Sequence, residues 1–343
     1  TVRLCQYNFF MRPPGINSNG DDHKSERLHH FIEHELGRFD VIAFQELFDF
    51  GSSRRNELIK AAYAQGYKFS VANPQQCAAK LRIDGGLVII SRLPIVRYAS
   101  LTFDRGVDSD WLAAKGVLYA KLRVGGDQHL HLFTTHLQSS YNRNYPMTDR
   151  AVQIRLKQLY AIRRFMDAEL RDEPTDQLII LAGDFNVNGR SDNTADADKG
   201  VGSDEYRAAL DILYGAGIHP SLVPGSRQDG NVYVSENKFL VEDLLYDHYK
   251  LHPVTFADVK TDANGDVELD PHGQPIPRET QLTDKKALGW RARLDYIFAI
   301  RRGEDPHNVA KDIASPDRTQ VEPFFVSKDQ QQSMPVTQLS GTC

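Results

Sequence analysis

Cysteine is scarce in this chain, which has three cysteines among 343 residues, at positions 5, 77 and 343. The odd count allows one disulfide with a free thiol, or none, so it does not fix the redox compartment. Long apolar runs are also missing, because none approaches the roughly 20 residues that a membrane-spanning helix needs. We therefore expect a soluble or peripheral protein.

An excess of positive charge is lacking too, since 41 basic residues face 46 acidic ones and the formal net charge is −5. A surface that binds a polyanion is expected to be basic, so nucleic acid is the less favoured partner. An acidic enzyme can still keep a local basic groove, and a nuclease therefore stays open as an alternative.

No stretch rich in serine, glycine or proline divides the chain into two compositional halves. We therefore predict a single domain over residues 1–343, with a loop-rich insertion at about residues 220–290. The hydrophobic fraction of 41% supplies enough apolar material for a core between two sheets.

What the chain does contain is an informative tetrad, Gly183-Asp184-Phe185-Asn186, directly after the apolar run at residues 178–181. Alternation along a strand places Asp184 and Asn186 on one face of the sheet edge. The carboxylate can bind a hard cation or accept a proton, and the amide can donate to phosphoryl oxygens without adding negative charge. Because these residue types are also common in turns, the tetrad alone is equally consistent with a simple turn.

Three other expected strands also end on polar side chains. The strand at residues 2–8 ends on Asn8, that at 40–46 on Glu46, and that at 130–137 beside His136. Asn8 and Glu46 have the character of metal ligands, and a histidine can move protons near neutral pH. Because four separate strands end on reactive groups, we predict that these groups share one site.

Helical spacing of apolar residues predicts helices at residues 24–36, 56–63 and 148–170. Strands are expected at residues 85–91 and 95–103. A hairpin over residues 116–135, turning at Gly125-Gly126, is expected to deliver His136.

Residues 262–266 imitate the opening of a calcium loop, with Asp262, Asn264 and Asp266 at alternate positions. Val267 stands where such a loop needs glycine, and Gly273 where it needs glutamate. We therefore favour a hairpin turn here.

Taken in order, several of these motifs resemble those of the endonuclease/exonuclease/phosphatase superfamily. They are Asn8, Gln45-Glu46, Thr135-His136-Leu137, the tetrad at 183–186 and Leu294-Asp295-Tyr296-Ile297-Phe298. The resemblance, which extends to about residue 300, implies a DNase I-like fold: a four-layered α/β sandwich of two mainly antiparallel sheets flanked by helices. It also implies cleavage of phosphate esters with a divalent cation, usually Mg²⁺, with Mn²⁺ or Co²⁺ as alternatives.

Within that superfamily the chain looks most like the neutral sphingomyelinases. The stretch from His136-Leu137-Gln138 through residues 141–143 to 150–153 is similar to the one that follows the catalytic histidine in those enzymes. The segment 110–116, with Asp110 and Lys115, resembles the Asp/Lys segment that they use near the substrate phosphate. The expected reaction is hydrolysis of sphingomyelin to ceramide and phosphocholine at a membrane surface, of phospholipase C type. A phosphoinositide phosphatase is a further alternative.

The resemblance also implies a division of roles. Mg²⁺ would be held by Glu46, with Asn8 close by, and would bind a phosphate oxygen. Asp184 and Asn186 would lie on the opposite side, orienting the attacking water and stabilising the transition state. His136 would donate a hydrogen bond or a proton to the phosphoryl oxygen.

Lys115 is the expected cation for the same phosphate, with Asp110 holding it toward or away from that group. The alternative is an ordinary surface ion pair, worth under about 1 kcal/mol.

One departure concerns the general base. In the superfamily, the aspartate that matches Asp295 orients a histidine from an Asp-His pair further along, and no such pair follows here. Asp247-His248 has the right residues but precedes Asp295, so we interpret this pair as a chance match to the motif, a decoy without a catalytic role. Either the chain stops just short of the base, which we favour, or it is a noncatalytic binder of a phosphorylated ligand. At the other end, Thr1 in place of methionine indicates a removed leader or a trimmed chain, and favours a secreted or peripheral location.

Apolar and aromatic residues could supply the contacts to a lipid. Phe9, Phe10 and Met11 follow Asn8, so they are expected either to form an apolar lip touching acyl chains or to pack in the core. A choline headgroup would be bound by an aromatic cage. The candidates for that cage are Trp111, Tyr141 and Tyr145.

Overall fold

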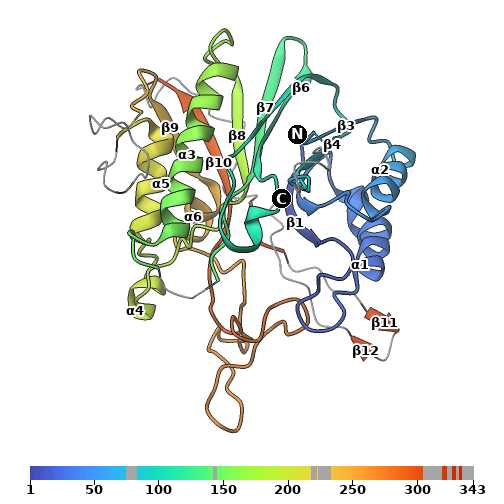
Figure 1. Ribbon diagram of the computed structural model, residues 1–343, viewed down its shortest axis with the longest axis vertical. Helices are drawn as coiled ribbons and strands as arrows, with labels where there is room; N and C mark the ends of the chain where they lie inside the picture. The colour runs from blue at the N-terminus through green and yellow to red at the C-terminus, as the bar shows by residue number, and fades with distance from the viewer. Residues whose placement is uncertain are drawn as a thin grey trace.

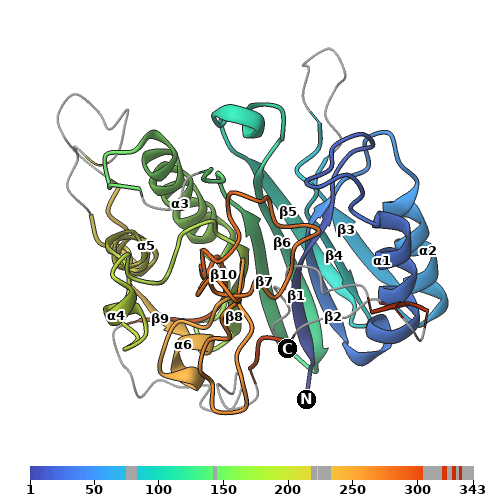
Figure 2. The ribbon, with the colours of Figure 1, turned by 90° about the horizontal axis from the view of Figure 1, so that it is seen from below.

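The computed structural model describes residues 1–74, 83–141, 145–217, 222, 233–303, 319–322, 327–329 and 332–333. Two β-sheets pack face to face, and helices cover the outer face of each sheet (Figure 1). Figure 2 shows α1 (Lys24–His30) and α2 (Arg54–Ala64) on one side of the sheets, with α3 (Arg150–Glu169) and α5 (Asp204–Tyr214) on the other. The expected four-layered sandwich is therefore confirmed.

The smaller sheet has four strands in the order β1-β2-β4-β3. Their bounds are β1 Leu4–Met11, β2 Val41–Leu47, β4 Val88–Ser91 and β3 Phe69–Ala72. β1 and β2 are parallel, and the other neighbours are antiparallel. The expected helix at residues 24–36 is α1 continued by a π-helical turn, Phe31–Glu35, and a short 3₁₀ helix, Leu36–Arg38.

The larger sheet has six strands in the order β5-β6-β7-β8-β10-β9. Their bounds are β5 Ile95–Thr102, β6 Gly116–Gly125, β7 Gln128–His136, β8 Leu178–Asp184, β10 Asp295–Arg302 and β9 Phe239–Asp243. β7 and β8 are parallel and all the other pairs are antiparallel. The β6–β7 hairpin turns at Gly125-Gly126 as expected. Because each sheet has one parallel pair and its other pairs are antiparallel, both sheets are mainly antiparallel, as expected.

Alternation along the strands builds the core. Val41 and Ala43 of β2 pack between the two sheets, whereas Ile42 and Phe44 point the other way, against the helices. Because both faces of each sheet are covered, the strands are apolar on both faces rather than on one. The strand ends are left as the places where polar groups can be exposed to solvent or substrate.

The remaining described elements are short. They are a 3₁₀ helix, η4, at Asp108–Trp111, α4 (Thr194–Ala197), α6 (Leu244–Tyr249), and the strands β11 (Ser327–Asp329) and β12 (Gln332–Ser333). None of the described helices combines the length and apolar character that crossing a membrane requires.

The stretch expected to be a loop-rich insertion contains two regular elements in its described part. β9 completes the larger sheet and α6 follows it, and from residue 250 to 292 only isolated bridges occur. The side chain of Asp262 accepts hydrogen bonds from the backbone N–H groups of Asn264 and Asp266, at 2.8 and 3.0 Å. Thr261 bridges Val267 in antiparallel fashion, so the hairpin turn is confirmed.

Candidate active site

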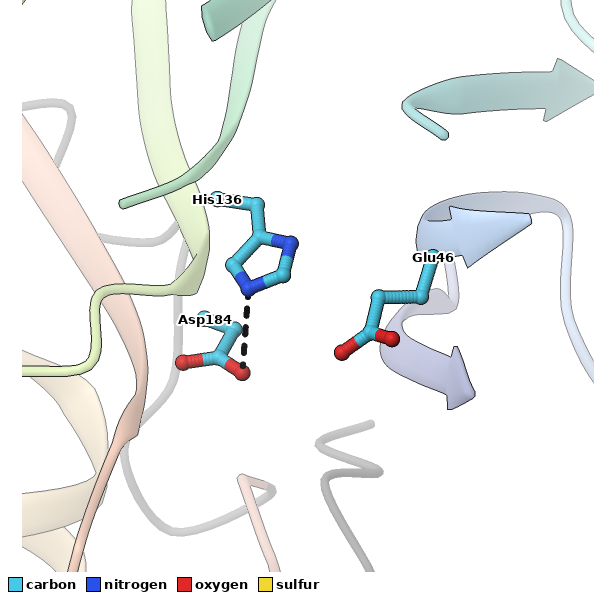
Figure 3. A group of neighbouring side chains, drawn as sticks. All are labelled: Glu46, His136 and Asp184. Carbon is cyan, nitrogen blue, oxygen red and sulfur yellow. Dashed lines mark ion pairs between the residues drawn. The ribbon is translucent and has the colours of Figure 1, made fainter. Parts of the chain in front are cut away.

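The polar strand ends meet at one edge of the sandwich. Glu46 comes from the smaller sheet, and His136 and Asp184 come from the larger one (Figure 3). One ligand atom of each lies within 4.8 Å of the others, and His136 Nε2 is 3.8 Å from Asp184 Oδ2. The expected convergence of Glu46 and Asp184 is therefore confirmed, Asp184 joins Glu46 as a candidate metal ligand, and His136 lies beside both.

Strand register explains why His136 and Asp184 lie side by side. β7 and β8 are parallel and pair residue by residue up to His136 and Asp184. Gly183, which has φ +148°, makes this approach feasible, because a Cβ there would lie 2.1 Å from the Thr135 carbonyl oxygen. A residue with a side chain at this position would push the two strands apart.

Asn8 links the two sheets across the site. Its amide nitrogen donates to Glu46 Oε1 at 3.0 Å and to Asp184 Oδ2 at 2.8 Å. Its amide oxygen accepts from the backbone N–H of Phe10 at 3.1 Å. Asn8 thus acts as a donor between the two carboxylates, and its direct contact with a metal stays a prediction.

The two carboxylates sit in an unfavourable setting for negative charge. Burial raises the pKa of both Glu46 and Asp184 above their ordinary values, and the hydrogen bonds from Asn8 offset part of the rise. A divalent cation between them would compensate the desolvation of both groups. Two carboxylate side chains from facing sheets supply the oxygen donors that Mg²⁺ prefers, so these residues fit the implied metal.

Asn186 stays near Asp184 through a local turn. Its backbone N–H donates to Asp184 Oδ1 at 2.9 Å, and its φ of +52° is one that asparagine tolerates. Its amide nitrogen donates to the Leu137 carbonyl at 3.0 Å. A carboxamide has two N–H groups, so the second can donate to a phosphoryl oxygen.

Lys115 is buried beneath His136 rather than on the surface. Its ammonium group is 2.8 Å from Asp110 Oδ2 and donates to Leu137 O at 2.6 Å and Ser139 Oγ at 2.8 Å. The alternative of a surface ion pair is therefore wrong, since both side chains are at most one-tenth exposed. Asp110 in turn accepts from the Ser139 backbone N–H at 2.6 Å, so it holds the lysine against this loop.

The same lysine sets the state of His136. Lys115 Nζ lies 3.0 Å from His136 Nε2, so this nitrogen accepts and the proton of the neutral ring is on Nδ1. Burial, and then the lysine charge, lower the pKa of His136 well below its ordinary value. Nδ1 is buried and its proton has no hydrogen-bond acceptor among the described residues.

Asp295 lies under the site and not in its wall. It pairs with Asp184 across β8 and β10, and it is buried. Its carboxylate accepts from Thr255 Oγ1 at 2.7 Å and from Gln6 Nε2 at 3.2 Å. Asp295 therefore has a structural role that needs no histidine, because its carboxylate ties together both sheets and a loop.

A cavity of about 830 Å³ opens over the site. Seven of the eight expected site residues line it: Asn8, Glu46, Asp110, Lys115, His136, Asp184 and Asn186. Asp295, Asp247 and His248 do not line the cavity, which agrees with Asp247-His248 being a decoy. His307 lies outside the described residues.

The aromatic lining differs from the expectation. Phe9 and Met11 are fully buried in the core, and only Phe10 of that trio lines the cavity. Tyr141 and Tyr145 line it, whereas Trp111 lies outside it with the Arg105 guanidinium 4.0 Å from its ring centroid. Asn142 and Arg143 lie outside the described residues.

Phe48, which follows β2, also lines the cavity, and so do Phe256 and Trp290. Phe256 and Trp290 come from the irregular segment after α6, where no periodic pattern could have pointed to them.

Residues 5–299 match the Endonuclease/Exonuclease/phosphatase family. The chain belongs to this family. It is 30% identical to a sphingomyelinase of Dictyostelium discoideum, over 96% of this chain and 75% of that protein. Sphingomyelinase C of Listeria ivanovii is also 30% identical, over 51% of this chain and 49% of its own length, so the match spans about half of that bacterial relative. By this relationship the chain is a phosphodiester hydrolase of the sphingomyelinase-like kind.

Solved structures share the fold along nearly the whole chain. Sphingomyelinase C from Streptomyces griseocarneus has a TM-score of 0.57 at 22% identity, covering 99% of this chain and 97% of its own. A Staphylococcus aureus beta toxin mutant with bound magnesium ions has a TM-score of 0.57 at 17% identity, covering 99% and 98%. TDP2 of D. rerio complexed with a single-strand DNA product has a TM-score of 0.52 at 17% identity, covering 99% and 96%. At these identities the likeness shows the fold alone.

Proposed function

We propose that this protein is a Mg²⁺-dependent phosphodiesterase of phospholipase C type that hydrolyses sphingomyelin to ceramide and phosphocholine. The observation that carries the proposal is the cluster of Glu46, His136 and Asp184 at one cavity, contributed by both sheets. The similarity to sphingomyelinases supports the choice of substrate.

Glu46 and Asp184 would hold the magnesium ion, with His136 beside them. When bound, magnesium supplies a Lewis acid that polarises a phosphoryl oxygen and offsets the charge developing on it. Asp184 also orients the attacking water. A cation bound between the two sheets would offset the cost of placing the buried Asp184 and the partly buried Glu46 so close together.

The remaining polar groups act on the phosphoryl oxygens. His136 Nδ1 and the second N–H of Asn186 are the donors that the site leaves for negative charge developing in the transition state. Lys115 adds positive charge behind the His136 ring and keeps Nε2 occupied. Asp110 fixes the lysine, so this charge stays where the phosphate binds.

The cavity wall suits a choline headgroup and a lipid substrate. Tyr141 and Tyr145 offer ring faces to a quaternary ammonium group, and Trp290 is a third such residue. Phe10 and Ile16 provide an apolar rim beside the metal cluster. We infer a peripheral enzyme that takes its substrate from a membrane surface and is secreted or membrane-associated.

The decisive assay is release of phosphocholine from labelled sphingomyelin vesicles in the presence of Mg²⁺. Turnover is expected to be lost in EDTA and in His136→Ala, while His129→Ala, on the same strand but away from the cavity, keeps wild-type activity. Removing a group that assists proton transfer lowers the rate by about 10² to 10⁴-fold.

Two outcomes would contradict the proposal. Faster cleavage of abasic DNA or of a phosphoinositide would reassign the substrate, and TDP2 shows that this fold also accepts DNA. Mg²⁺-dependent binding of sphingomyelin without any turnover would instead indicate a noncatalytic binder.

A further inference from the structure

Glu46 sits in a backbone conformation that needs external support. Its φ is +53°, in the left-handed region that residues with a side chain rarely adopt. Such a conformation is strained for a residue with a side chain and persists only where its surroundings hold it. The neighbouring contacts must therefore supply that restraint.

A second loop lies directly against the back of Glu46. The backbone N–H of Leu47 donates to the carbonyl of Gly86 at 3.0 Å. A Cβ on Gly86 would lie 2.9 Å from Glu46 Cα, and Gly86 has a φ of +66°. The Gly86 N–H donates to Asp84 Oδ1 at 2.8 Å, so Asp84 controls the position of this supporting loop.

Arg55 joins that loop to the segment that follows Glu46. Its guanidinium, on α2, is 2.7 Å from Asp49 Oδ2 and 3.5 Å from Asp84 Oδ1. Asp84 Oδ2 also accepts from the backbone N–H of Asp49 at 3.0 Å. Arg55 and Asp84 are buried, at 7% and 5% exposure, so water screens this charge network little.

None of these three side chains lines the cavity. They act on the segment that follows Glu46 and on the Gly86 loop packed against it, and a buried ion pair from a helix can fix two irregular segments relative to each other. The network reaches Glu46 through Gly86, whose N–H donates to Asp84 and whose carbonyl accepts from the N–H of Leu47, the residue after Glu46.

We propose that Arg55, Asp49 and Asp84 form a clasp that holds Glu46 in its left-handed conformation and thereby sets the affinity of the site for its divalent cation. Arg55 is a positioning residue in this inference, because it touches neither the substrate nor the metal. The inference rests on the proposed function in one respect, namely that Glu46 is a metal ligand.

The test is calorimetric titration of the folded protein with Mg²⁺ alone, which needs no substrate. Arg55→Gln is expected to weaken Mg²⁺ binding by about 10 to 100-fold, the usual effect of removing a group that orients a metal ligand. Arg55→Lys keeps the charge and should recover part of the affinity. Lys60→Gln removes an exposed charge from the same helix and should bind Mg²⁺ as the wild type does.

The Mg²⁺ dependence of turnover distinguishes a role of Arg55 in positioning Glu46 from a role in overall protein stability. In Arg55→Gln, the Mg²⁺ concentration for half-maximal turnover should rise with the dissociation constant, while kcat at saturating Mg²⁺ stays within a few-fold of wild type. Asp49→Asn is a milder variant, since Asp49 is the less buried partner, and should weaken Mg²⁺ binding in the same direction.

The outcomes are distinguishable. Wild-type Mg²⁺ affinity in folded Arg55→Gln overturns the clasp and leaves the proposed function standing. If Arg55→Gln does not fold, unchanged affinity in Asp49→Asn overturns it equally. If the wild-type protein binds no divalent cation, the proposed metal site and the clasp both fall.

Discussion

The two sheets hold their halves of the site in different ways. On the larger sheet, the β7–β8 ladder runs in regular register to its last pair, His136 and Asp184. On the smaller sheet, the β1–β2 ladder becomes irregular after Asn8, and Phe10 and Glu46 both have positive φ. One half is positioned by backbone pairing, and the other leaves the ladder and depends on side chains.

Buried arginines take over where the smaller sheet's ladder ends. Arg27 donates to the carbonyls of Phe9 and Phe10 at 2.8 and 2.9 Å, satisfying groups that the irregular strand leaves without ladder partners. Arg55 acts after β2 through carboxylates. Buried backbone carbonyls must find donors, so a site built on a distorted strand needs such side chains.

The largest expected loss of stability comes from a substitution in the larger sheet's half of the site. Gly183→Ala forces a Cβ to within 2.1 Å of the Thr135 carbonyl, at a φ of +148°. We expect it to lower the free energy of unfolding by about 3 to 5 kcal/mol, or to prevent folding, as overpacking plus backbone strain would. Urea unfolding measures this, with Gly125→Ala as control, because nothing lies within 4 Å of a Cβ at Gly125. Equal stability of the two variants would contradict the ladder argument.

A somewhat smaller loss is expected from the smaller sheet's half. Arg27→Met removes the donors to Phe9 and Phe10 and leaves their buried carbonyls unsatisfied. The free energy of unfolding should fall by about 2 to 4 kcal/mol. Arg171→Met, at an exposed position, is the matched control in the same unfolding experiment. A loss no greater than that of the control would show that this half needs no arginine.

Metal binding should join the two halves. A ligand at 100 times its dissociation constant stabilises a folded protein by about 2.7 kcal/mol. Mg²⁺ at that concentration should therefore raise the melting temperature of the wild type, and EDTA should reverse the rise. Glu46→Gln and Asp184→Asn remove one ligand from each sheet, and each should abolish most of the shift. A shift that survives in either variant would place the cation on one sheet only.

The smallest effect concerns acid sensitivity, which we assign to the larger sheet's half. Burial lowers the pKa of His131, on β7, to about 4, while the unfolded side chain titrates near 6.5. The unfolded state binds more protons between these values, so stability is full above about pH 6.5 and falls as pH drops toward about 4. His131→Gln should flatten this loss by about 1 to 2 kcal/mol, seen by urea unfolding at several pH values. His129→Gln, more exposed on the same strand, should keep the wild-type slope.

The sequence was sufficient for the longer helices α1, α2 and α3, for the strands that carry the site and for most of the site residues, but it did not predict α5 or β9. Apolar runs closed by polar residues predicted β1, β2, β7 and β8, and the structure brings Glu46, His136 and Asp184 together as the shared site required. It could not show that Lys115 is buried under His136, because a lysine and an aspartate five residues apart are usually exposed. Trp290 was missed because it lies in an irregular segment, and Arg55 because its partner Asp84 is distant in the chain.

By itself the sequence determined the alternation of apolar residues, and hence strands buried on both faces with their chemistry confined to the ends. Only the tertiary structure decided which ends meet. Strand order, the approach of β7 to β8 at Gly183, and the pairing of Arg55 with Asp84 depend on contacts between segments far apart in the chain. The secondary-structure propensities of the residues do not predict such contacts, because the free energy of these contacts is gained only once the two sheets have packed.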